Sequence, residues 1–118
     1  MAMTHVHQRI RNTKEGGIMS IKISGYVFEG PYESTELIKD ESGVYVILCQ
    51  KKDNVPTVID IGESSEIKTR IDNHDRIKCW GDNCSFTICI AVYYTTEIQR
   101  MLIEKQLREE YEPPCGKE

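Results

Sequence analysis

Five residues of this chain have side chains suited to phosphate chemistry. The planar guanidinium of Arg70 matches two phosphate oxygens at once. The carboxylates of Asp60 and Glu104 are of the kind that Mg²⁺ prefers as ligands. Tyr45 and His74 can hydrogen-bond to water, and a histidine can also accept a proton from it near neutral pH. If the fold gathers these groups, the set can bind a phosphate and a hydrated cation.

Three segments have the pattern of β-strands. Gly43 to Cys49 is apolar on both alternating faces and rich in β-branched residues, which is typical of a central strand covered on both sides. A charged turn separates it from Thr57 to Gly62, and the two segments predict a hairpin. Ser85 to Tyr94 alternates among strand-forming residues and predicts a third strand. Ile21 to Tyr26 alternates only weakly and predicts a short strand or arm.

A first helix is expected between the second and third strands. Ser64 or Ser65 can cap its N-terminus, and Ile67 and Ile71 form a stripe that continues through His74, the helix ending at about Ile77. Arg70 and His74 are four residues apart and therefore lie on the same side of this helix.

A second helix is expected to follow the third strand. Thr96 and Gln99 have the spacing of a capping box, and Pro113-Pro114 ends the helix after about Tyr111. Its apolar side is expected to consist of Ile98, Leu102, Ile103 and Leu107. The order of hairpin, helix, strand and helix predicts an α/β (α+β) domain with a small three-stranded, mainly antiparallel sheet flanked by helices.

Length and composition predict one domain. The chain has 118 residues, of which 39% are hydrophobic and 29% charged, as in small globular domains. Residues 1–18 are polar and end in Gly16-Gly17 and Ile18, so we interpret them as a flexible tail or upstream extension, and residues 19–118 as the domain. The longest uncharged apolar stretch, Phe86 to Tyr94, is too short for a membrane-spanning helix, so we expect no membrane contact.

The charge argues against a protein that holds nucleic acid by bulk electrostatics alone. The formal net charge is −4 and the isoelectric point is about 5.4. The segment from Glu66 to Trp80 is locally basic, with four basic and three acidic residues. We therefore expect this segment to face any phosphate, with an affinity that falls readily with salt.

The cysteines predict a reducing compartment. Five is an odd number and the N-terminus has no apolar signal-peptide core, so we expect free thiols in the cytoplasm. Cys79 to Cys84 is loop-like, and its spacing is not that of a paired Cys-x-x-Cys zinc knuckle. Cys89 lies within an apolar strand, where a buried thiol is ordinary.

The order of these elements and residues resembles the GIY-YIG nuclease superfamily. Over residues 41–116, Gly43-Val44-Tyr45 stands for the first signature tripeptide and Asp60-Ile61-Gly62 for the second, and the two helices carry Arg70 and Glu104 in the family's order. The resemblance implies a divalent-metal-dependent endonuclease that hydrolyses phosphodiester bonds, mainly in DNA. It also implies that Glu104 holds Mg²⁺ or Mn²⁺, that Arg70 neutralises the scissile phosphate and that Tyr45 positions or deprotonates the attacking water.

Two positions depart from the family pattern. Asp60 stands where the second signature tyrosine is expected, and Pro113-Pro114 is followed by Cys115-Gly116 rather than by an asparagine that helps to fix the site. An anion at position 60 repels phosphate unless a cation intervenes, although it can also act as a second metal ligand. The alternative function is a catalytically inactive module on the same scaffold that binds nucleic acid or a protein partner.

Each predicted site residue also has a structural interpretation. Glu104 lies four residues from both Arg100 and Arg108, which is the spacing of ion pairs along a helix. Arg70 has the same spacing from Glu66. Tyr45 can fill a core with its hydroxyl satisfied at the edge, and His74 can pack at the end of the helix stripe. The sequence leaves enzyme and inactive module open.

Overall fold

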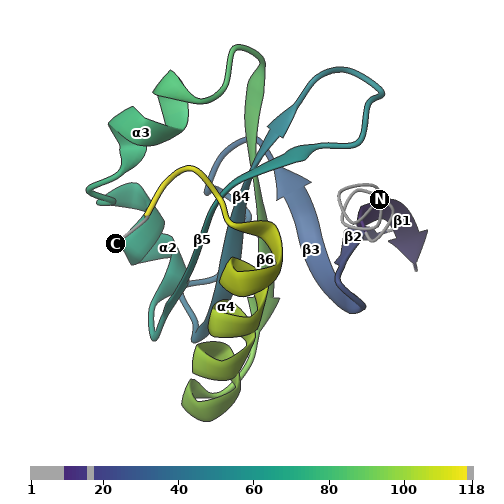
Figure 1. Cartoon of the computed structure of the whole chain (residues 1–118). Helices are drawn as coiled ribbons and strands as arrows, with labels where there is room; N and C mark the ends of the chain where they lie inside the picture. The colour runs from purple at the N-terminus through teal and green to yellow at the C-terminus, as the bar shows by residue number, and fades with distance from the viewer. Residues whose placement is uncertain (1–9, 16–17, 117–118) are drawn as a thin grey trace.

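The described part of the chain forms a six-stranded antiparallel sheet with helices on both faces (Figure 1). The computed structural model describes residues 10–15 and 18–116. Across the sheet the strands run in the order β1-β2-β3-β6-β4-β5, and every neighbouring pair is antiparallel. The strands are β1 (Ile10–Glu15), β2 (Ile18–Ile23), β3 (Tyr26–Tyr32), β4 (Gly43–Gln50), β5 (Thr57–Ser64) and β6 (Thr87–Tyr94). The helices are α2 (Ile67–Asp72), α3 (Ile77–Asp82) and α4 (Glu97–Tyr111).

The expected three-stranded sheet is therefore wrong, although the α/β class is as expected. The three predicted strands correspond to β4, β5 and β6, and the sheet continues from β6 through β3 and β2 to β1. Ser24 and Gly25 both have positive φ, of 54° and 88°, and they join β2 to β3 as a tight two-residue turn. Because this turn pairs the weakly alternating segment with a following strand, the segment is part of a hairpin rather than an isolated arm.

Part of the expected N-terminal tail belongs to the sheet. Ile10–Glu15 form β1, which pairs with β2 from Ile10 opposite Ile23 to Glu15 opposite Ile18. Residues 1–9, 16 and 17, the rest of the expected tail apart from Ile18, lie outside the described residues.

A β-bulge in the β4–β5 hairpin decides which face Asp60 occupies. Ile47 pairs with Asp60 and Leu48 pairs with Val58, so Ile59 is an extra residue on β5. Without the bulge, simple alternation would place Asp60 on the same face as Val58, under α4. With it, Asp60 shares a face with Ile47 and points toward α3.

The two faces of the sheet have separate cores. The core under α4 includes Val44, Val46 and Leu48 from β4 together with Ile103 and Leu107 from the helix. The core under α2 and α3 includes Tyr45, Ile47, Ile71 and Trp80. Because β4 contributes alternate residues to both cores and is buried over seven positions in a row, it is the central strand that its sequence predicted.

The first predicted helix is two short helices. α2 ends at Asp72, and α3 begins at Ile77 and includes most of the segment expected to be a loop between Cys79 and Cys84. Neither helix has a side-chain N-cap, so the expected cap at Ser64 or Ser65 is wrong. The break between the helices matters because it places His74 in the connecting turn, where its backbone N–H donates to the carbonyl of Ile71.

The last helix begins as predicted but packs differently. Thr96 is the N-cap of α4 and its side chain accepts a hydrogen bond from the backbone N–H of Gln99. Ile103 and Leu107 are buried as expected. Ile98 and Leu102, expected on the same apolar side, are instead 71% and 59% exposed. Only one side of the helix contacts the sheet.

Four cysteines form disulfides, so the expectation of free thiols throughout is wrong. Cys49 is bonded to Cys84, and Cys79 is bonded to Cys115. Cys89 is a buried free thiol, as predicted. Both disulfides lie on the α2 and α3 face. Cys79–Cys115 joins α3 to the C-terminal segment, and Cys49–Cys84 joins the segment after α3 to the end of β4. Among the described residues, no helix has the length and apolar character needed to cross a membrane.

Candidate functional site

Tyr45 and Gly62 form a close pair on β4 and β5. The two residues are opposite each other in the strand register, and a β-carbon at position 62 would overlap the phenol oxygen and its ring carbon. Glycine is therefore required for Tyr45 to lie flat across β5. The two signature segments thus meet in space, and Tyr45 is 1% exposed.

The hydroxyl of Tyr45 contacts the imidazole of His74. The distance from Tyr45 Oη to His74 Nε2 is 2.7 Å. The backbone N–H of Arg76 donates to His74 Nδ1 over 3.0 Å, so Nδ1 is an acceptor and the proton of the neutral ring lies on Nε2. A carboxylate oxygen of Asp75 is also 3.4 Å from Nδ1, but the shorter bond has a fixed hydrogen and decides the assignment. His74 therefore donates to the phenol oxygen, which leaves the phenolic O–H free to donate elsewhere.

Burial keeps both members of this pair neutral at physiological pH. It raises the pKa of Tyr45 to about 12, even though the nearby charges of Arg70 and Arg76 act in the opposite direction. Burial also lowers the pKa of His74 to about 4, and the same two arginines lower it further. Neither group is ionised near pH 7 in the protein alone.

Arg70 lies beside this pair at the protein surface. It is in the last turn of α2, its side chain is 38% exposed, and its guanidinium is 3.0 Å from a carboxylate oxygen of Asp75. The predicted pairing with Glu66 is wrong, since Asp75 takes that place. Tyr45, His74 and Arg70 are thus brought together, and part of the guanidinium remains open to solvent.

Asp60 is the centre of a buried ion-pair cluster. Its carboxylate is fully buried and accepts five hydrogen bonds from four residues: Ile61, Arg76, Trp80 and Arg108. The shortest are from Trp80 Nε1 and Arg108 Nη2, both 2.7 Å. Two guanidinium groups, from Arg76 and Arg108, therefore balance the charge of this carboxylate.

Glu104 lies at the outer end of the same cluster. Its Oε2 accepts a hydrogen bond of 2.9 Å from Arg108 Nε, and its side chain is 26% exposed. The helix ion pair with Arg108 is confirmed, whereas Arg100 bonds instead to Glu63 over 2.6 Å. Glu104 is therefore connected through Arg108 to Asp60, and Asp60 through Arg76 to the imidazole of His74.

The C-terminal segment closes the free edge of β5. The backbone N–H of Cys115 donates to the carbonyl of Ile59 over 3.1 Å. Arg108 donates to the carbonyls of Ile61, Cys115 and Gly116. Gly116 has φ of +82°, and a β-carbon there would overlap the Arg108 guanidinium. Where the resemblance led us to expect an asparagine, this chain has a backbone segment that surrounds the Arg108 guanidinium.

Sequence reasoning missed three members of the cluster. The sequence indicates Arg76 and Trp80 only as members of a locally basic segment, and Arg108 only as an ion-pair partner for Glu104. The bulge at Ile59 is what turns Asp60 toward these donors, and neither composition nor periodicity signals a bulge.

The basic segment is largely neutralised by local acids. Each of its four cations has a carboxylate partner, in the pairs Lys68–Asp72, Arg70–Asp75, Arg76–Asp60 and Lys78–Asp82. The expected phosphate-facing surface therefore has little net positive potential, and only pairs at the surface, such as Arg70–Asp75, can open toward a phosphate.

Glu104 is the one candidate in this cluster for holding a divalent cation. Within the described part of the chain no three histidine, cysteine, aspartate or glutamate side chains gather as a metal-binding group. Mg²⁺ nevertheless binds proteins through one or two carboxylates, completing its shell with water and substrate phosphate. Glu104 fits that pattern, because Arg108 contacts only its Oε2 and the side chain reaches solvent. Asp60 does not fit, since it is enclosed by donors.

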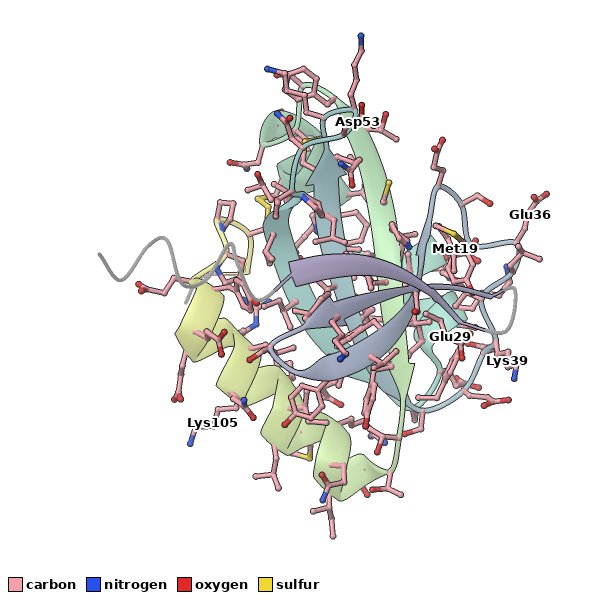
Figure 2. All side chains as sticks on the ribbon, turned by 90° about the vertical axis from the view of Figure 1, so that its right-hand side faces the viewer. Met19, Glu29, Glu36, Lys39, Asp53 and Lys105 are labelled. Atoms are coloured by element: carbon pink, nitrogen blue, oxygen red, sulfur yellow. A yellow bond between two sulfur atoms is a disulfide. The ribbon has the colours of Figure 1, made fainter. Side chains whose placement is uncertain are left out.

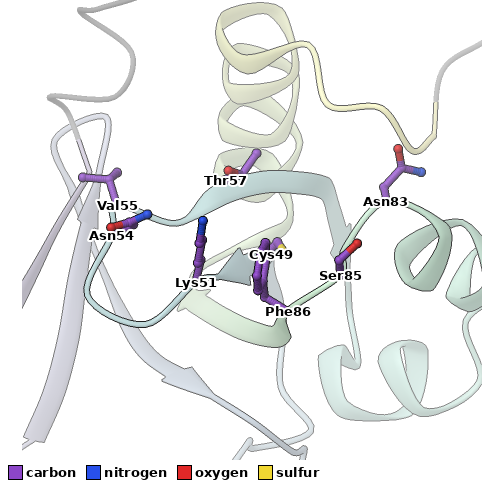
Figure 3. Close-up of a pocket in the computed structure, with 8 residues that line it drawn as sticks. All are labelled: Cys49, Lys51, Asn54, Val55, Thr57, Asn83, Ser85 and Phe86. Atoms are coloured by element: carbon purple, nitrogen blue, oxygen red, sulfur yellow. The ribbon is translucent and has the colours of Figure 1, made fainter.

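A cavity of about 310 Å³ lies elsewhere, at the loop end of the β4–β5 hairpin (Figure 3). Lys51, Val55 and Phe86 are among its lining residues, and the Lys51 ammonium lies 5.1 Å from the centre of the Phe86 ring. None of the five predicted site residues lines this cavity. The candidate site is instead a surface around Arg70 backed by the buried Tyr45–His74 pair.

Comparison with known proteins does not identify the chain: no family model matches it, and no curated protein or solved structure is significantly similar.

Proposed function

We propose that the protein is a divalent-metal-dependent nuclease of the GIY-YIG type that hydrolyses phosphodiester bonds in DNA. The observation that carries the proposal is the 2.7 Å contact between Tyr45 and His74 beside the partly exposed guanidinium of Arg70. A buried phenol from a strand and a buried imidazole from a turn lie behind a partly exposed guanidinium from a helix, next to the buried Asp60 cluster. Such groups are rarely buried together for stability alone, because their desolvation is costly.

In this proposal Arg70 binds the scissile phosphate. A phosphate oxygen would replace the exposed Asp75 carboxylate as the partner of the guanidinium, exchanging one anion for another. Because Asp75 is 71% exposed and readily solvated, releasing it costs little. This exchange gives the surface a means of accepting a phosphate despite its low net charge.

In this proposal Tyr45 orients the attacking water rather than deprotonating it. Its pKa of about 12 makes it a poor base near pH 7. With His74 Nε2–H donating to the phenol oxygen, the phenolic O–H would hydrogen-bond to a water or a phosphate oxygen once substrate binding uncovers the phenol, which is 1% exposed in the protein alone. His74 acts as a positioning residue that holds the phenol through its fixed tautomer.

Glu104 would hold Mg²⁺ or Mn²⁺. The bound ion would supply charge stabilisation for the leaving oxygen of the phosphodiester. For Glu104 to serve in this way, Arg108 must keep its bonds to Asp60 and to the C-terminal carbonyls, so that the arginine stays in place while the Glu104 carboxylate turns outward.

A second candidate function is an inactive module that binds nucleic acid or a protein partner. The observation that favours it is the saturation of Asp60, which accepts five hydrogen bonds and leaves no group to replace the second signature tyrosine. The change Asp60→Tyr cannot test whether the missing tyrosine is the cause of inactivity. It would also remove the hydrogen-bond acceptor for Arg76, Trp80 and Arg108 and so disturb the fold.

The test is cleavage of supercoiled plasmid and of branched or flapped DNA in Mg²⁺ or Mn²⁺, combined with DNA binding at low salt. We expect cleavage by the wild-type protein and its loss in Arg70→Ala and Glu104→Gln, with Glu109→Gln, an exposed change on the same helix, as the matched control. Equal cleavage by all variants would mean a contaminating nuclease and would remove the proposal. Absence of cleavage with salt-sensitive binding that is lost in Arg70→Ala would favour the inactive nucleic-acid-binding module.

The predicted cytoplasmic location belongs to the proposal as well. It rested partly on free thiols, and the two disulfides weaken that ground, since disulfides persist mainly in oxidising compartments. The cleavage assay should therefore be run with oxidised and with reduced protein.

A further inference from the structure

The outer side of α4 carries an exposed apolar stripe. Ile98, Met101 and Leu102 are 71%, 54% and 59% exposed, and all three lie on the side of the helix opposite to the buried Ile103 and Leu107. Their spacing of three and four residues makes them contiguous on the helix surface. Single exposed apolar residues are ordinary, but adjacent large ones on a well-formed helix usually mark a contact surface.

The charges around this stripe are arranged so that the surface complements itself. Lys105 continues the stripe one turn beyond Met101 and projects from α4 away from the sheet (Figure 2). Glu97 lies at the other end, with a side chain that is 72% exposed. Glu97 is only loosely held, at 3.8 Å from Arg100, because Arg100 forms its close bond to Glu63. The stripe therefore has an available anion at one end and a cation at the other.

We propose that α4 binds a second copy of this chain, with the two helices antiparallel across a twofold axis at Met101 and Leu102. In this arrangement Ile98 packs against the aliphatic part of Lys105 of the partner subunit, and Glu97 reaches the ammonium group of the same residue. By symmetry each contact occurs twice. A parallel pair would set each charge against its own copy and is disfavoured.

The small size of the stripe indicates how tightly the proposed dimer should associate. Three apolar residues and two ion pairs form an interface near the low end of the known range, where complexes are weak and reversible. We therefore expect a monomer at low concentration and a dimer that appears as concentration rises. The dimer does not depend on the proposed nuclease function, because the stripe faces away from the sheet, and Tyr45 of β4 and Arg70 of α2 lie on the opposite face of that sheet.

The first test is analytical ultracentrifugation of the full chain from low micromolar to millimolar concentration. We expect a reversible dimer that Leu102→Glu weakens by at least about tenfold, equivalent to about 1.4 kcal/mol. The matched control is Leu37→Glu, at a leucine in the loop before β4 that is 76% exposed and so more exposed than Leu102, and this change should leave association unchanged. A wild-type protein that stays monomeric throughout, or equal association of both variants, would overturn the proposal.

A charge exchange tests the antiparallel arrangement separately. Glu97→Lys and Lys105→Glu should each weaken the dimer, and the double variant should restore it, because the exchanged charges again meet their opposites. Failure of the double variant to restore association would refute the antiparallel pairing. Both changed side chains are exposed, so the free energy of unfolding should fall only by the small cost of placing a lysine in the first turn of α4.

Discussion

The two faces of the sheet are built from the same strands but hold different kinds of groups. The face under α4 is apolar throughout its buried core and contains the free Cys89. The face under α2 and α3 contains the buried Asp60 and His74, the Tyr45 hydroxyl and both disulfides. Apart from the buried Ser24, which donates to Glu110 of α4, one face is explained by packing, whereas the other holds several groups whose burial must be offset by specific partners.

This difference indicates where changes should affect stability alone and where they should also alter pH dependence or the site. On the α4 face a substitution removes contacts and leaves a cavity. On the other face a substitution also leaves a charge or a donor without its partner. Because those partners come from distant parts of the chain, their positions should change as well. The following experiments test that difference, from the largest expected effect to the smallest.

Asp60→Asn should be among the most damaging single changes. It leaves Arg76 and Arg108 partly buried without their anion, which typically costs about 3–5 kcal/mol in the free energy of unfolding. Urea denaturation monitored by circular dichroism measures this. Leu107→Ala on the α4 face is expected to cost a comparable ~2–5 kcal/mol but without disturbing the Tyr45–His74 pair. A loss below 1 kcal/mol for Asp60→Asn, on the order of an ordinary surface change, would contradict the cluster as described.

Reduction of the disulfides should destabilise the protein by about 2–4 kcal/mol for each bond. The two bonds close loops with sequence separations of 35 and 36 residues. Thiol titration in denaturant should detect Cys89 alone before reduction and all five cysteines afterwards. The control is Cys89→Ala, which should leave the effect of reductant unchanged. Five reactive thiols in unreduced protein would show that the disulfides do not form.

Stability should depend on pH through His74 and Tyr45. The folded pKa of His74 is about 4 against an ordinary 6.5, so the unfolded state binds more protons between these values and stability is lost as pH falls through them. The folded pKa of Tyr45 is about 12 against 10.0, so the unfolded state loses its proton first and stability falls as pH rises between those values. Each effect is on the order of 3 kcal/mol.

His74→Gln should flatten the acidic side of this profile, and Tyr45→Phe the alkaline side. Denaturation at a series of pH values measures both, and each variant is compared with the wild type so that other titrating groups cancel. A profile for His74→Gln parallel to that of the wild type would refute the assignment of a neutral, buried imidazole.

Gly62→Ala should have a smaller effect on stability but a specific one on the site. The added methyl group would overlap the Tyr45 ring, and overpacking of this kind costs about 1–3 kcal/mol. The Tyr45–His74 contact should be lost, so the alkaline loss of stability assigned to Tyr45 should also shrink. Gly81→Ala is the matched control, because a β-carbon there meets nothing within 4 Å. An unaltered pH profile in Gly62→Ala would contradict the close approach.

Some of this architecture could be predicted because the relevant signals are local. The apolar run of β4, the capping residues Thr96 and Gln99 and the burial of Ile103 and Leu107 follow from periodicity and side-chain chemistry over a few residues. The placement of Arg70 and His74 near each other also follows from their four-residue spacing, whereas the closeness of Tyr45 to Arg70 was implied only by the family resemblance.

The rest depended on contacts between distant segments. The bulge at Ile59 sets the side on which Asp60 lies, yet its cause is the pairing of whole strands rather than a local residue. Cys79 and Cys115 are 36 residues apart, and no spacing rule indicates that they meet. Ile98 and Leu102 fit the helical period of Ile103 and Leu107 well enough to be grouped with them, but a helix on a sheet buries only one side.

The segment after α4 also protects the edge strand β5 against pairing with strands of other molecules. A strand at the margin of a sheet presents unpaired amide and carbonyl groups that can template the addition of a foreign strand. Cys115 and Arg108 occupy the outward carbonyls of Ile59 and Ile61, so β5 offers few vacant sites for such growth. A chain shortened after Tyr111 would keep Arg108 but lose Cys115, so the Ile59 carbonyl at this edge would be open to edge-to-edge pairing.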